Sequence, residues 1–215
     1  MKKLVALLTA LLLALCMISI SAAESATVTV TLAPWEHEAG WLSFSAFAQS
    51  DVLLDAWETG AKHFAPILGI ENLDGEMLRA MNAQMCGFED GIVALTVADN
   101  SVTASDESGN VVFSYTYSCI DTLENAIDGA TAYVFETSDE NAGKYHFLCM
   151  TLPDVASAEG GVITNFNLRY TEKDYKALFA DEYEGVTCIL VRGDTTLENM
   201  DYTIRLIYGG SADAQ

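Results

Sequence analysis

Two asparagines separated by one residue form the most distinctive polar feature of this chain. They lie in a segment, 163–170, that alternates in the manner of a β-strand, so Asn165, Asn167 and Arg169 share one face and the apolar residues between them share the other. A polar row on a strand faces either water or a polar cavity. The two side-chain amides can orient a small molecule by hydrogen bonds, or offer neutral oxygens to a hard cation.

The segment around these asparagines resembles the signature of the ZinT family, extracytoplasmic zinc-binding proteins with a lipocalin-like barrel. The likeness is carried by NFNLRYTEKDYKALF at 165–179, in which Asn165 and Asn167 stand where the family has two metal-binding histidines. The sequence KYHFLCMTLPD at 144–154 resembles a neighbouring strand of the family, whose third histidine falls on Thr151. The resemblance therefore implies a zinc site at Thr151, Asn165 and Asn167.

A second stretch resembles the start of the family's domain. Trp35, Gly40, Trp41 and Ser43 are similar to a Trp-x-Gly-x-Trp motif followed by serine, with two more residues between the tryptophans. The resemblance extends from residue 35 to about residue 207. We expect the two indole rings to plug the end of a barrel or to lie under its helices.

The residue types at the three implied metal positions do not suit zinc. Zinc sites are built from imidazole, thiolate or carboxylate groups, whereas amide and hydroxyl oxygens suit calcium better and bind it weakly when no carboxylate is present. The three histidines of the chain, His37, His63 and His146, are more typical of solvated or hydrogen-bonded side chains than of ligands. We therefore expect tight zinc binding to have been lost.

Three functions remain open from these residues. The first is a ZinT-like protein that binds a divalent metal, the second a lipocalin-like binder of a small organic ligand in the barrel cavity, oriented by Asn165 and Asn167. The third is an acidic surface or structural protein with a packed barrel. No nucleophile elbow, phosphate-binding glycine loop or HExxH helix is present, so we expect no enzymatic activity.

The first 23 residues are typical of a secretory signal. Lys2 and Lys3 precede an apolar run at 4–20, and small residues up to Ala23 permit cleavage. Lipidation at Cys16 is the alternative to cleavage after Ala23. We expect a secreted bacterial protein, or one held in the periplasm or cell envelope, without a further membrane span.

The composition restricts the partners of the exported chain. Ten lysines and arginines stand against 31 aspartates and glutamates, which gives a formal net charge of −21. Such a surface repels phosphate backbones, so we expect no nucleic-acid partner. Four cysteines follow the signal without CxxC spacing, and their pairing stays open, as does the oligomeric state: Cys86, Cys119, Cys149 and Cys188.

The period of the apolar residues predicts the elements that position the asparagines. Two helices come first, at about 50–64, broken by Pro66 and Gly69, and at 74–86, with a methionine row on its core face. Strands follow at 92–98, 101–105, 111–118, 131–137, 145–152, 163–170 and 187–192, with a helix at 173–181 capped by Thr171 and a last helix from 194 or 195 to 207.

This order is typical of a mainly β fold with attached helices (α+β), a lipocalin- or calycin-like antiparallel β-barrel with helices near one mouth. The expected organisation is a signal at 1–23, an N-terminal segment at 24–34, one barrel domain at 35–208 and a flexible tail at 209–215.

Overall fold

The computed structural model describes residues 30–155, 163–180, 183 and 185–209. The expected signal at 1–23, residues 24–29 and the tail after Gly209 lie outside these ranges, so what the sequence indicates for them stays a prediction. The chain divides into the units Met1–Val30 and Thr31–Gln215, and the fold below is that of the second unit.

One antiparallel sheet of ten strands forms the body of this unit. The strand order is β4-β3-β2-β1-β10-β9-β7-β6-β5, and the short β8 pairs with β9 beside β7. The strands are β1 (Trp41–Ser43), β2 (Ile92–Ala98), β3 (Ser101–Asp106), β4 (Val111–Thr116), β5 (Ser118–Ile127), β6 (Ala130–Glu136), β7 (Phe147–Thr151), β8 (Asp154–Val155), β9 (Thr164–Thr171) and β10 (Cys188–Arg192).

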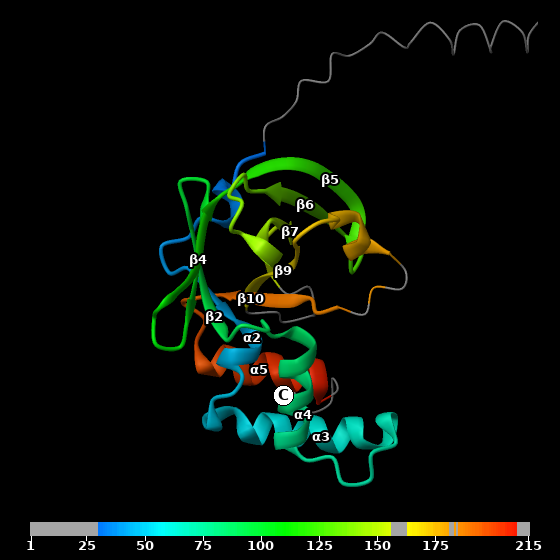
Figure 1. The fold of residues 1–215 in the computed structure, drawn as a ribbon. Coiled ribbons are helices and arrows are strands. Elements are labelled where there is room, and N and C mark those ends of the chain that lie inside the picture. The colour runs from blue at the N-terminus through cyan, green and yellow to red at the C-terminus, as the bar shows by residue number, and fades with distance from the viewer. Residues whose placement is uncertain (1–29, 156–162, 181–182, 184, 210–215) are drawn as a thin grey trace, which may run out of the picture. The chain divides into compact units, whose positions relative to one another are not determined.

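The sheet curls into a half-barrel (Figure 1), so the predicted mainly antiparallel β fold with attached helices is confirmed, but the barrel is not closed. Its two outer strands, β4 and β5, follow each other in the chain with only Tyr117 between them, yet they do not pair. The N–H of Tyr117 donates to the carbonyl of Asn100 at 2.8 Å, which adds one more rung to the β3–β4 ladder. β5 then pairs with β6 and carries two register shifts in that pairing, which add twist.

Aromatic side chains fill the concave face of the half-barrel. Trp35 and Trp41 are buried there, with ring centroids 5.3 Å from Phe135 and 4.8 Å from Phe166, respectively. Trp41 on β1 packs against Phe166 on β9, which is not its neighbour in the sheet, and Trp35 reaches β6 from a turn before the first strand, so these contacts hold the curled sheet together from inside. The two tryptophans therefore lie within the core of the half-barrel.

The helices form a second layer on the other face of β1 and β10 (Figure 1). Leu42, Ile189 and Val191 from the sheet pack there against helix side chains, among them the fully buried Trp57. The helices are α2 (Phe44–Phe47), α3 (Leu54–Leu68), α4 (Gly75–Cys86) and α5 (Leu197–Tyr208), with shorter 3₁₀ turns η1 (Ala33–Trp35), η2 (Asp51–Leu53), η3 (Gly143–Tyr145) and η4 (Tyr175–Phe179).

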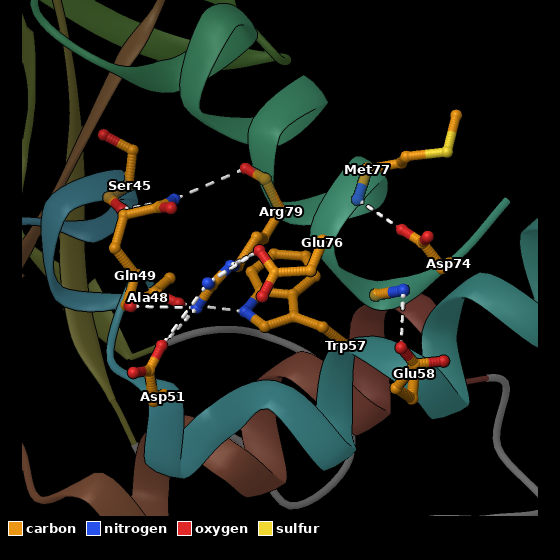
Figure 2. Close-up of polar contacts among 11 residues, drawn as sticks. Ser45, Ala48, Gln49, Asp51, Trp57, Glu58, Asp74, Glu76, Met77 and Arg79 are labelled. Carbon is orange, nitrogen blue, oxygen red and sulfur yellow. Dashed lines mark hydrogen bonds and ion pairs between the residues drawn. The ribbon is translucent and has the colours of Figure 1, made fainter.

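An arginine on α4 ties the helical layer together, as Figure 2 shows. Arg79 donates to the carbonyl of Gln49 at 2.9 Å and pairs with Glu76 at 2.7 Å and Asp51 at 3.3 Å. The indole of Trp57 donates to the carbonyl of Ala48 at 3.0 Å in the same region. These bonds fix the loop between α2 and α3 against α4.

Several helix boundaries differ from the sequence predictions. Of the two residues predicted to break the first helix, Gly69 ends it, with φ of 68°. Pro66 does not, because it lies in the last turn, where its missing N–H costs one bond. The predicted helix at 173–181 is only the short η4, capped by Asp174 rather than Thr171. The last helix is capped by Thr196.

Two further differences from the sequence predictions concern exposed side chains. The strand β5 was not predicted, because its exposed acidic residues mask the alternation that marks other strands. The methionine row of α4 is only partly a core face: Leu78 is 2% exposed, whereas Met77 and Met85 are 44% and 55% exposed.

Candidate functional site

The structure brings Thr151, Asn165 and Asn167 together on one pocket of about 700 Å³. The pocket lies where the β5–β6 turn, the β7–β8 connection and the start of β9 meet. Its described lining contains no lysine, arginine or histidine. The lining residues are Ile127, Asp128, Ala130, Thr131, Tyr133, Thr151, Leu152, Pro153, Asp154, Val155, Asn165 and Asn167.

The asparagine pair does not line the interior of the half-barrel, which corrects the expectation of a ligand in a barrel cavity. Asn167 pairs with Ile189 and Asn165 with Val191, and paired residues of antiparallel strands share a face. That face carries the helical layer further along β10. Phe166, 1% exposed, points the other way into the aromatic core. The predicted alternation along β9 is confirmed, but the face that carries Asn165 and Asn167 is the outer face of the half-barrel.

Thr151 lies at a β-bulge, where its side chain hydrogen-bonds to the backbone of β9. Three residues, 151–153, oppose only two residues of β9, because Met150 pairs with Leu168 and Asp154 with Asn165. Pro153 has no N–H to offer the ladder at this point. The hydroxyl of Thr151 accepts the backbone N–H of Asn167 at 3.0 Å, and its carbonyl accepts the indole N–H of Trp35 at 2.8 Å.

The pocket also contains two carboxylates that the sequence analysis did not select. Asp128 occupies the β5–β6 turn with φ of 50°, followed by Gly129 at 80°, and its Oδ2 accepts from Nδ2 of Asn167 at 3.3 Å. Asp154 stands opposite Asn165 in the β8–β9 pair. The Asp-Gly dipeptide between two strands was the available signal, since it is typical of a two-residue hairpin turn.

The histidines of the chain lie away from this pocket. His146 is not on the predicted strand but ends η3, with Nε2 at 3.2 Å from Oε1 of Glu136. Nδ1 of His37 accepts the N–H of Ala39 at 3.2 Å. His63 packs edge-on against Phe64 on α3.

The residues present do not fit a zinc site like the one the resemblance implies. Among the described residues, no group of three or more histidine, cysteine, aspartate or glutamate side chains could hold a metal ion. At the three implied positions, the Thr151 hydroxyl already accepts a backbone N–H, and the two carboxamides are poor zinc ligands. A hard cation has two carboxylates and two amide oxygens at hand, which is short of the six to eight oxygens that calcium takes.

The cysteines offer no reactive thiolate near the pocket. Burial raises the pKa of the Cys149 thiol to about 12, against a small lowering by the charge of Arg169. Burial also raises the pKa of the Cys86 thiol, and the negative charge of Asp128 adds to that rise. All four described cysteines are free thiols.

The fold is similar to that of a ZinT-like domain. The Zn(II)-bound ZinT-like domain of Streptococcus pneumoniae AdcA superposes with a TM-score of 0.55 at 14% identity, over 84% of this chain and 92% of that domain. Zn(II)-bound AdcA from the same organism gives a TM-score of 0.53 at 13% identity, over 86% of this chain and 37% of its own length.

Comparisons at the level of sequence give no match. No family model matches the chain, and no curated protein matches it. At 13–14% identity the structural likeness shows the mainly antiparallel fold alone. Within the described part of the chain, no helix has the length and apolar character needed to span a membrane.

Proposed function

We propose that this chain is a non-enzymatic binding protein that acts outside the cytoplasm, has kept a ZinT-like fold and has lost tight zinc coordination. One observation carries the proposal: the three implied metal positions converge on a single pocket, but they present two carboxamides and a hydroxyl that is already bonded. The pocket is concave, accessible and lined by both polar and apolar groups, which favours binding over a purely structural role. The two zinc-bound neighbours support the link between this fold and ligand binding.

Restoring the implied histidines tests the proposal. Chelator-stripped protein should show no change in melting temperature with 10 μM ZnCl₂, whereas the T151H/N165H/N167H variant should gain stability. If the variant binds zinc with a Kd about 100-fold below the free concentration, linkage adds about 2.7 kcal/mol to the free energy of unfolding. For a domain of this size that corresponds to about 5–10 °C.

A control separates this site from adventitious histidine pairs. Ser114 and Thr116 form an exposed pair on β4 with the same i, i+2 spacing as the asparagines. The S114H/T116H variant should gain far less stability from zinc. Zinc stabilisation of the unchanged protein at micromolar concentration contradicts the proposal, and so does a T151H/N165H/N167H variant that folds but gains nothing.

A further inference from the structure

The pocket at Asn165 and Asn167 is negatively charged without compensation from its own walls. Asp128 from the β5–β6 turn and Asp154 from β8 contribute two carboxylates beside the asparagine pair, and none of the twelve lining residues is cationic. The rest of the chain strengthens this field, because its formal net charge is −21. The charge of Asp128 reaches the end of α4, where it contributes to the raised pKa of Cys86 after burial. An occupant of this pocket therefore carries positive charge.

Backbone geometry holds the two carboxylates in place. Asp128 lies at a corner of the β5–β6 turn, where it and Gly129 both have positive φ, and the amide of Asn167 donates to it at 3.3 Å. Asp154 is held by the β8–β9 pairing, and its Oδ1 accepts the N–H of Val155 at 2.7 Å. Each carboxylate keeps a second oxygen or lone pair for a further donor.

Half of the residues that line the pocket are apolar, and apolar side chains supply no ligands to a bare metal ion. Six lining residues are hydrophobic, and three of them are exposed: Ala130, Leu152 at 45% and Val155 at 51%. The volume of about 700 Å³ falls within the range of roughly 300–1,000 Å³ that is typical of small-molecule sites. The ring of Tyr133 packs edge-on against Trp35, with ring centroids 5.7 Å apart, so the apolar surface open to a ligand comes mainly from Leu152 and Val155.

From this combination we infer that the pocket binds a small organic cation, an ammonium group attached to an apolar or aromatic body. The ammonium donates to Asp128 and Asp154, and the amide oxygens of the two asparagines accept its remaining hydrogens. The body of the molecule covers Leu152 and Val155. This inference rests on the proposed function, because it assigns a ligand class to the same pocket.

Phenethylammonium chloride tests the inference, with uncharged 2-phenylethanol and CaCl₂ as comparison probes. Isothermal titration and melting temperature should show saturable binding of the amine in the millimolar range or tighter, and no binding of the alcohol. The D128N/D154N variant should weaken amine binding at least tenfold. The E140Q/E172Q variant removes two exposed charges elsewhere and should bind as the unchanged protein does, which excludes a general charge effect.

The outcomes separate this inference from the proposed function. Saturable binding of calcium that depends on Asp128 and Asp154, without amine binding, overturns the organic-cation inference and leaves the binding role standing. Equal binding of the alcohol and the amine also overturns it, because charge then plays no part. Equal loss of amine binding in both double variants overturns it as well, since the pocket would not be the site.

Discussion

Replacement of Thr151 by valine separates a structural role of its hydroxyl from a ligand-binding one. The change keeps the shape of a side chain that is only 5% exposed, but it removes the acceptor for the Asn167 N–H at 3.0 Å. A buried donor left without a partner costs about 1–3 kcal/mol. The added methyl group returns about 0.8 kcal/mol when it is fully buried, so the net loss is about 0.2–2 kcal/mol.

This loss is measurable by thermal and chemical unfolding. For a domain of this size it corresponds to a fall of up to about 8 °C in melting temperature. Hydrogen exchange at the Asn167 amide should accelerate in the same variant, because the ladder at the β-bulge has no other acceptor at that position.

Thr131 provides the matched control for this prediction. It lines the same pocket, and its hydroxyl makes no hydrogen bond among the described residues. The T131V variant should therefore melt within about 2 °C of the unchanged protein. The reasoning is refuted if T151V is as stable as T131V and the exchange of the Asn167 amide is unaltered, since the Thr151 hydroxyl would then be free for a ligand.

Two further variants and one labelling experiment have defined outcomes. R79M should lower the free energy of unfolding by about 1–2 kcal/mol in urea titration, because the bond to the Gln49 carbonyl is lost, whereas the exposed carboxylate partners contribute little. The hydrogen bond from Lys144 lowers the pKa of the Asp90 carboxyl below 3.8. The ionised Asp90 therefore stabilises the fold above pH 3.8, and this stabilisation is lost as the pH falls through the folded-state pKa. The D90N variant lacks this group, so its melting temperature should fall less on acidification. The Cys149 thiol, with a pKa of about 12, should resist iodoacetamide at pH 8 and react only on unfolding, and native labelling would contradict its burial.

Local chemistry explains which parts of the fold could be predicted. The β2–β3–β4 meander was predicted within a few residues, because it has strict alternation and turn residues that tolerate positive φ. The helix α4 was placed correctly, since Asp74 caps it by accepting the Met77 N–H at 2.8 Å. Both signals act over a few residues, and tertiary contacts do not override them.

The closure of the sheet could not be predicted in this way. It depends on whether the outer strands β4 and β5 pair, and only the order of strands in the folded sheet shows that they do not. The direction of the polar face is a similar case. Alternation places Asn165 and Asn167 on one face of β9, but only the rings of Trp41 and Phe166 show which face is the inside.

The sequence by itself determined the strand that carries the asparagines, their common face and the absence of imidazole from the three implied metal positions. Those properties follow from residue type and a period of two. Only the tertiary structure decided that Thr151 is occupied by a backbone bond and that Asp128 and Asp154 join the pocket. The reason is physical: a pocket is formed where segments distant in the chain converge, and strand pairing and turns set that convergence.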